Sequence, residues 1–192
     1  MTVFHWVRHG PTHSKTFVGW RDLPADLTAT DQVARLSAHL PVDAVVISSD
    51  LTRSVQTADA ICDGRQRLPH SPLLREFNFG AWDGLHSDVI SERYPDGSRD
   101  YWKSPGDIAP PGGETWNAAA ARVSVAADHL ARRFADRPVI VVAHIGVILT
   151  QVQRALGARA RDVLAHKIDN LSVTEIDLRG TAPNVVRINH LP

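Results

Sequence analysis

Four residues of the sequence are of the types that bind and transfer a phosphoryl group. Three directly follow apolar runs that predict buried strands, and the fourth, an arginine, stands in the first turn of the helix predicted after such a run. They are Arg8, His9, Arg53 and His144. Because the carboxyl ends of parallel strands meet at one edge of a sheet, we expect the four side chains to lie close together. Guanidinium groups match phosphate oxygens bidentately, and helix N-termini add backbone donors. The pattern therefore predicts a site that holds a phosphoryl group.

A histidine and a glutamate are candidates for the covalent chemistry of such a site. Cationic neighbours disfavour the imidazolium form of a histidine, and a neutral imidazole facing a charge-neutralised phosphorus is a competent nucleophile. The departing alcohol then needs a proton. Glu76 is the candidate donor, because it stands in an otherwise apolar and aromatic run that favours a raised pKa. The alternative for Glu76 is an ion pair with Arg75.

We expect no metal site among the histidines. His9 and His13 have the spacing of a helical zinc pair, but the Gly10-Pro11 pair between them breaks a helix. His5 would share a face of an extended strand with His9, so it either lines the site or, as we expect, packs in the core. A core position is also the alternative for His144.

Strands and helices alternate along the chain and would position these residues. Short apolar runs predict strands, and apolar residues at three- and four-residue spacing predict helices. The predicted strands are residues 3–7, 44–47, 139–143, 171–178 and 185–191, and the predicted helices are residues 28–40, 51–61, 87–93, 114–134 and 146–156. Residues 73–79 are either another short strand or an extended loop. We therefore expect one α/β domain over residues 1–192, with a mostly parallel central sheet. Residues 94–113, rich in proline and glycine, are expected to be a loop excursion over the active site.

Five segments, in order, resemble the motifs of the histidine phosphatase superfamily, the group that contains phosphoglycerate mutases and many small phosphatases. The segments are residues 8–12 (RHGPT), 48–58 (SSDLTRSVQTA), 74–84 (LREFNFGAWDG), 110–114 (PPGGE) and 142–144 (VAH). The first segment alone would be a weak signal, whereas five in order are a strong one. The resemblance points to the small phosphatase branch and implies a phosphoglycerate mutase-like, three-layer α/β/α sandwich.

The same resemblance implies a role for each matching residue. His9 would become the phosphohistidine, and Arg8, Arg53 and His144 would hold the phosphoryl oxygens. Glu76 would protonate the leaving group and then help to activate water against the phosphoenzyme. No metal ion and no cofactor are implied, because a cationic pocket of this kind stabilises the charge of the transition state.

Further contacts with the substrate are expected from Thr12, Lys15, Trp20 and Ile145. Lys15 stands where many relatives have an asparagine near the phosphate, and it either extends the positive pocket or points to solvent. Ile145 follows the motif histidine, so we expect a narrower pocket in which its backbone N–H still bonds phosphate. Trp102, in the proline-rich excursion, is the first candidate for contact with an organic leaving group.

These observations predict a metal-independent phosphatase, a phosphoric monoester hydrolase, that acts on a small-molecule phosphomonoester through a phosphohistidine on His9. One alternative is phosphoglycerate mutase-type phosphoryl transfer. The short excursion disfavours it, since Arg99 and Lys103 are its only spare cations. The other alternative is a non-catalytic phosphoester-binding module, which would need the arginines but neither His9 nor Glu76.

Composition and charge limit the partners and the location. Of the 192 residues 43% are hydrophobic and 22% charged, as in globular proteins. The 21 basic residues balance the 21 acidic ones, which argues against nucleic acid or a membrane and leaves a small phosphorylated metabolite as the partner. The single Cys62 excludes an internal disulfide, and no apolar run suits a signal peptide or a membrane span. We expect a cytoplasmic protein, and no pattern indicates an oligomeric state.

Overall fold

A mixed, mostly parallel sheet runs through the centre of the molecule. The structure is a computed structural model that describes residues 2–192, and within them the sheet has six strands in the order β3-β2-β4-β1-β5-β6. The strands are β1 (Val3–Arg8), β2 (Val45–Ser48), β3 (Gln66–Arg67), β4 (Val139–Ala143), β5 (Val173–Asp177) and β6 (Asn184–His190). Strands β1 to β4 pair in parallel, whereas β5 and β6 pair antiparallel. The predicted parallel core and closing pair are confirmed.

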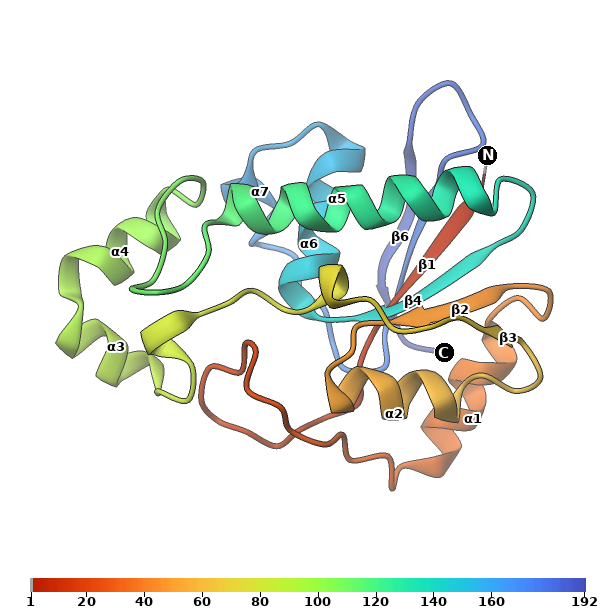
Figure 1. Ribbon diagram of the computed structural model, residues 1–192, viewed down its shortest axis with the longest axis horizontal. Coiled ribbons are helices and arrows are strands. Elements are labelled where there is room, and N and C mark those ends of the chain that lie inside the picture. Colours follow the sequence, from red (N-terminus) through yellow and green to blue (C-terminus); the bar gives the residue numbers. More distant parts are fainter. Residues whose placement is uncertain (1) are drawn as a thin grey trace.

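Helices cover both faces of this sheet (Figure 1). Their bounds are α1 (Thr30–His39), α2 (Thr52–Ala60), α3 (Ser87–Arg93), α4 (Pro95–Lys103), α5 (Trp116–Arg133), α6 (Ile145–Leu156) and α7 (Ala160–Val163). Side chains alternate along the central strands: Val46 and Ile140 pack with α1 and α2, while Val45 and Val139 pack with α5 and α6. Because a strand presents successive residues to opposite faces, two cores form, and the predicted three-layer α/β/α sandwich is confirmed.

The excursion over residues 94–113 is not the loop that we predicted. It contains α4, whose first residue is Pro95. Proline is favourable at the first helical position, since its missing N–H has no partner there and its fixed φ suits the helix. The prediction treated every proline of the segment as a helix breaker. Helix α4 packs on α3 through Tyr101, Ile90 and Trp82. We call α3 and α4 together the helical cap, and Figure 1 shows it beyond the end of the sheet.

Residues 73–79, for which the sequence predicted either a short strand or an extended loop, form a loop. A short 3-10 turn spans Pro72–Leu74, and the chain continues without strand pairing to the next turn at Gly80–Trp82. A short strand that the sequence did not indicate, β3, lies at the sheet edge beside β2. No helix within residues 2–192 is long and apolar enough to cross a membrane.

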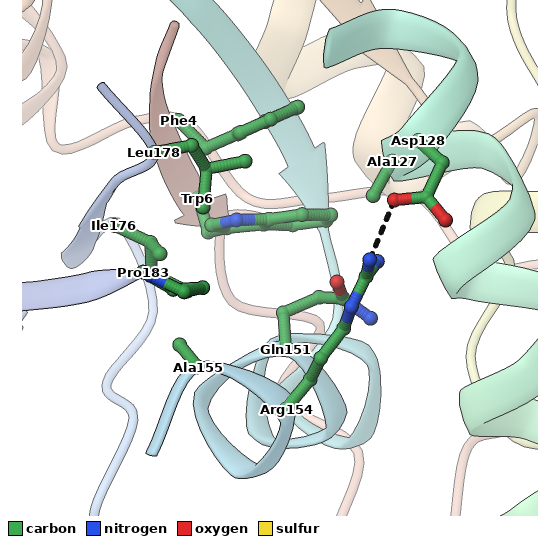
Figure 2. Close-up of a pocket in the computed structure, with 10 residues that line it drawn as sticks. All are labelled: Phe4, Trp6, Ala127, Asp128, Gln151, Arg154, Ala155, Ile176, Leu178 and Pro183. Carbon is green, nitrogen blue, oxygen red and sulfur yellow. Dashed lines mark hydrogen bonds and ion pairs between the residues drawn. The ribbon is translucent and has the colours of Figure 1, made fainter. Parts of the chain in front are cut away.

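A small cavity lies on the α5 and α6 side of the core (Figure 2). It holds about 50 Å³ between the rings of Phe4 and Trp6 and the chain at Pro183, with the Arg154–Asp128 ion pair at its edge. A cavity of this size has room for a few water molecules. It lies along β1 away from the end that carries Arg8, so it is a gap in the packing and not a substrate site.

Candidate active site

A cavity of about 350 Å³ lies beyond the carboxyl end of β1, where the strand order brings the chemically active residues together. We call it the strand-end cavity. Candidate residues from the sequence that line it are Arg8, His9, Thr12, Lys15, Glu76, Trp102 and Ile145. Strands β1 and β2 both pair with β4, with Arg8 opposite Ala143 and Ser48 opposite Val142. The predicted meeting of strand ends is therefore the basis of the site.

His9 has one ring nitrogen free for chemistry. The side chain is buried, and Nδ1 lies 2.7 Å from the carbonyl oxygen of Gly10. Since a carbonyl only accepts, we assign the proton to Nδ1, which leaves a lone pair on Nε2. Burial and then the charge of Arg53 lower the pKa of His9 to about 3. The imidazole is therefore neutral over the physiological range, as a nucleophile requires.

The backbone around His9 is held from two sides, by Thr57 from the second motif segment and by Asn170, which the sequence analysis did not identify. Asn170 donates to the His9 carbonyl at 2.7 Å, and the backbone N–H of Gly10 donates to Thr57 Oγ1 at 2.9 Å. Asn170 comes from the turn before β5, far along the chain. The hydrogen bonds to Asn170 and Thr57 fix the direction in which the His9 ring leaves the strand.

His144 lies beside His9, with 5.0 Å between the ring centroids. It is fully buried, its Nδ1 accepts from Arg53 Nε at 3.3 Å, and its Nε2 lies 2.8 Å from Ser49 Oγ. Because an arginine only donates, the His144 proton is assigned to Nε2, which donates to Ser49. Burial and then the neighbouring His9 hold the pKa of His144 well below its ordinary value. The pair therefore consists of two neutral imidazoles.

Arg53 is buried in the first turn of α2, and its guanidinium is engaged by the protein itself. Besides His144, it donates to the carbonyls of Gly19 at 2.7 Å and Arg21 at 3.0 Å. The residues that wall the strand-end cavity include Arg8 but not Arg53 or His144. In this structure Arg53 thus orients His144 and anchors the loop at residues 19–21. Direct contact of Arg53 with a phosphoryl group stays a prediction.

Arg8 carries an unpaired donor. Its Nη1 donates to the carbonyl of Ile168 at 2.6 Å, whereas its Nε is buried and has no hydrogen-bond partner within residues 2–192. A buried N–H on a cationic group is unfavourable unless an acceptor satisfies it. Since Arg8 lines the strand-end cavity next to His9, an anion bound there would provide the acceptor.

Glu76 is a buried carboxyl group in the same wall. Oε1 accepts from the backbone N–H of Phe77 at 2.9 Å, and Oε2 accepts from that of Gly146 at 3.2 Å. Arg75 instead binds Asp50 through two hydrogen bonds of 2.7 and 2.6 Å, so the alternative of a Glu76–Arg75 pair is wrong. Burial raises the pKa of Glu76, and the two backbone donors oppose the rise. A carboxyl group with a raised pKa can serve as an acid.

The main chain of Glu76 is also clamped. Its carbonyl accepts from Trp20 Nε1 at 2.8 Å and from Arg122 Nη2 at 2.9 Å, and Arg122 is itself paired with Glu114. Trp20, which we expected to contact substrate, lies outside the wall of the strand-end cavity, with the Arg75 guanidinium 5.0 Å above its ring. Glu114 is the last residue of the PPGGE segment, so the sequence analysis had singled out one member of this group. Arg122 lies outside the five motif segments and was not predicted.

Gly146 admits the Glu76 carboxylate where any other residue would not. A Cβ built on Gly146 would lie 2.5 Å from Oε1 of Glu76 and 3.0 Å from the Phe77 ring. Ile145 lines the strand-end cavity, as expected of a residue that contacts the substrate, and the narrowing of the pocket by its side chain stays a prediction. The glycine that follows keeps room for the carboxylate.

The two neutral histidines predict that the protein loses stability on acidification. Because the folded-state pKa of each is depressed, the unfolded chain takes up protons more readily below about pH 6.5. Each histidine then lowers the free energy of unfolding by at most about 1.4 kcal/mol per pH unit. Protonation of Glu76, whose pKa is raised, acts in the opposite direction.

We expect a net loss of about 2 kcal/mol between pH 7 and pH 5.5, measured by urea unfolding in phosphate-free buffer. His9→Gln should remove about half of the loss that His9 and His144 contribute together, because His144 alone then remains of that pair, while His5 and His39, whose pKa values burial also lowers, contribute equally in both proteins. An unfolding free energy that stays constant between the two pH values would contradict the neutral assignment.

In the part of the chain that the structure describes, no three His, Cys, Asp or Glu side chains are grouped to hold a metal ion. The groups that could hold an anion are instead Arg8, the backbone N–H of Ile145 at the start of α6 and Lys15, which also lines the cavity. The arrangement combines a cationic anchor, a neutral imidazole and a buried carboxyl group in one cavity.

Comparison with known proteins gives both mutases and phosphatases. A 2,3-bisphosphoglycerate-dependent phosphoglycerate mutase of Xanthobacter autotrophicus is 32% identical over 127 residues, which are 60% of this chain and 61% of the mutase. The chain thus spans about three fifths of the length of that curated relative.

Among solved structures, Bacillus stearothermophilus YhfR has 24% identity and a TM-score of 0.88, with 97% of this chain and 96% of that one covered. The complex of a mycobacterial glucosyl-3-phosphoglycerate phosphatase with inorganic phosphate has 25% identity and a TM-score of 0.85, with 99% and 98% covered. Both share the sandwich described above. The model of the histidine phosphatase superfamily, branch 1, matches residues 4–191, and this chain therefore belongs to that superfamily.

Proposed function

We propose that this protein is a metal-independent phosphatase that hydrolyses a small phosphomonoester through a phosphohistidine on His9. The observation that carries the proposal is the common cavity wall of a neutral His9, an unpaired Arg8 donor and the buried Glu76. Membership of the superfamily and the phosphatase among the structural neighbours support it.

In the first half of the reaction the phosphoryl group binds against Arg8 and the start of α6. Nε2 of His9 attacks phosphorus, the bond from phosphorus to the ester oxygen breaks, and Glu76 gives its proton to that oxygen. The alcohol leaves, with His9 phosphorylated and Glu76 ionised. Arg53 and His144 support this step by fixing the cationic surroundings of the transferring group.

In the second half a water molecule attacks the phosphohistidine. The Glu76 carboxylate takes the proton of the water, the bond between Nε2 and phosphorus breaks, and inorganic phosphate is released. His9 and Glu76 return to their starting protonation states. The cycle consumes one water molecule per ester and requires no other reactant.

Phosphoglycerate mutase activity is the second candidate, because the Xanthobacter relative carries that name. A mutase must bind a second anionic group of its substrate. In the helical cap, Arg99 is paired with Asp96 and Asp100, which removes one of the two cations expected to be spare. This favours hydrolysis, and Lys15 is the further cation that lines the strand-end cavity beside Arg8.

Rapid quenching of the reaction with p-nitrophenyl phosphate in EDTA tests the proposal. We expect one phosphoryl group on His9, labile to acid and stable to alkali, and steady release of nitrophenolate and inorganic phosphate. His9→Ala should show neither the label nor turnover. Inactivation by EDTA, or a label on another residue, would contradict the proposal, and conversion of 3-phosphoglycerate to its 2-phospho isomer would favour the mutase.

A further inference from the structure

A second, smaller cavity adjoins the strand-end cavity. It holds about 110 Å³ and shares four lining residues with the larger one: Glu76, Phe79, Trp102 and Ile145. The rest of its wall comes from Phe77, from α4, α5 and α6, and from the residue after α7, chiefly Tyr101, Trp116, Leu149 and Leu164. We call it the apolar annex. Because Glu76 belongs to both walls, the annex begins where the leaving oxygen of a substrate would be protonated.

The two cavities differ in chemistry. The strand-end cavity is lined by hydroxyl groups and cations, such as Ser14, Thr16 and Lys15. The annex is walled by aromatic rings and aliphatic chains, and the indole N–H of Trp116 is engaged by Gln153 at 2.6 Å. Besides the Glu76 carboxyl group, the Tyr101 hydroxyl and the Trp102 indole N–H, the side chains of the wall offer carbon. A charged or strongly polar group placed in the annex would lose more hydration than these few partners replace. The annex therefore favours an apolar hydrocarbon group.

Size sets an upper limit on what the annex takes. Apolar cavities of about 150 Å³ stay dry and take up benzene. At about 110 Å³ the annex suits a branched four-carbon chain and, with its open side toward the larger cavity, at most a phenyl ring. Trp102 lines both cavities and packs edge-on against Tyr101, with 4.8 Å between ring centroids, so a group that extends from one cavity into the other would contact it.

We propose that the apolar annex binds an apolar group of the leaving alcohol. The inference rests on the proposed function and deepens it: the substrate is a phosphomonoester whose alcohol carries a branched aliphatic chain or a small ring close to the ester oxygen. A polyol, or an alcohol with a carboxylate at that position, leaves the annex empty.

A series of esters on the unmodified enzyme tests this directly. The probes are methyl, isobutyl and benzyl phosphate, together with glycerol 1-phosphate. Burial of each further methylene is worth about fourfold in kcat/KM, so isobutyl phosphate should exceed methyl phosphate roughly 50-fold. Benzyl phosphate should exceed methyl phosphate at least as much, and glycerol 1-phosphate should stay near the methyl ester.

A matched pair of variants assigns the effect to the annex. Leu164→Trp fills the annex from its partly exposed side, and the preference for benzyl over methyl phosphate, both measured on the variant, should fall to within about threefold. Leu156→Trp, the same substitution at an exposed position of α6 outside both cavities, should keep the preference.

The possible failures are distinguishable. A flat ester series with intact turnover of p-nitrophenyl phosphate would overturn the annex proposal and leave the phosphatase standing. Absence of turnover on every ester, with no label on His9, would overturn the proposed function itself. If Leu164→Trp does not fold, calorimetric binding of benzylphosphonate against methylphosphonate to the unmodified protein decides, and equal affinities would overturn the annex.

Discussion

Glu76→Gln is expected to slow the hydrolysis of alkyl phosphomonoesters by about 10²–10⁴-fold, the contribution usual for a positioned general acid. Glutamine preserves the length of the side chain and can still accept from the backbone of Phe77. It has no proton to give to an alkoxide, which is a poor leaving group unless protonated. The loss should therefore appear in kcat, with a smaller change in KM.

A good leaving group separates the two roles proposed for Glu76. Nitrophenolate departs without a proton, so the first half of the reaction should proceed in Glu76→Gln, while attack of water on the phosphohistidine lacks its base. Stopped-flow measurement should show a burst of about one nitrophenolate per active site, followed by slow turnover. An equal loss on alkyl and nitrophenyl esters, without a burst, would contradict the acid and base roles.

Gly146→Ala provides a milder version of the same perturbation. Its Cβ would approach Glu76 Oε1 to 2.5 Å, so the carboxylate must move away from the position in which it is held. We expect the same selective loss on alkyl esters. Gly97→Ala is the matched control, because Gly97 lies in α4 at a negative φ with nothing within 4 Å of an added Cβ, and its activity should not change.

Most of the fold could be predicted because the buried strands are local features of the sequence. Val139–Ala143 is apolar at every position, which is typical of a strand covered by helices on both faces. The prediction of a loop over residues 94–113 was wrong because the structure of that segment depends on distant contacts. Whether Pro95 ends a helix or begins one depends on the residues that pack behind it, here Trp82 and Ile90 against Tyr101, and they lie in other segments.

The candidate site shows the same division between local and distant information. The residue types at the strand ends predicted which side chains meet, and the structure places His9 and His144 5.0 Å apart. The sequence did not predict that Arg53 donates hydrogen bonds to the carbonyls of residues 19 and 21. It also did not predict that Arg122, from α5, donates to the carbonyl of Glu76. Long arginine side chains reach partners whose positions only the tertiary fold defines.

Arg65→Met is expected to lower the free energy of unfolding by about 3–5 kcal/mol, the largest stability effect that we predict for a single substitution. Arg65 is 6% exposed, and the hydrogen bonds that its guanidinium makes within residues 2–192 go to carbonyl oxygens and the Ser37 hydroxyl. These carbonyls lie where α1 and α2 end. The acceptors are the carbonyls of Ser37 at 2.8 Å, Leu40 at 2.8 Å, Pro41 at 2.7 Å and Ile61 at 3.0 Å.

These carbonyls explain the size of the effect. The last carbonyls of a helix have no partner within the helix, and the two C-termini carry partial negative charge that a buried cation compensates. Methionine fills much of the same volume but donates nothing, so several buried acceptors lose their partners, at about 1–3 kcal/mol each where water cannot replace the bond. Arg65→Lys should recover part of the loss, since an ammonium group keeps the charge but reaches fewer of the carbonyls.

Urea unfolding at pH 7 measures the loss, and the melting temperature should fall by about 2–4 °C for each kcal/mol in a chain of this length. Arg154→Met is the control, because that arginine forms an exposed ion pair with Asp128 that is worth at most about 1 kcal/mol (Figure 2). Turnover per folded molecule should be unchanged in both variants, since neither residue lines the strand-end cavity or the apolar annex. Equal stability of the two variants would mean that water, and not Arg65, forms the hydrogen bonds of the carbonyls at the ends of α1 and α2. The contact between these two helix ends would then be stabilised by apolar packing alone.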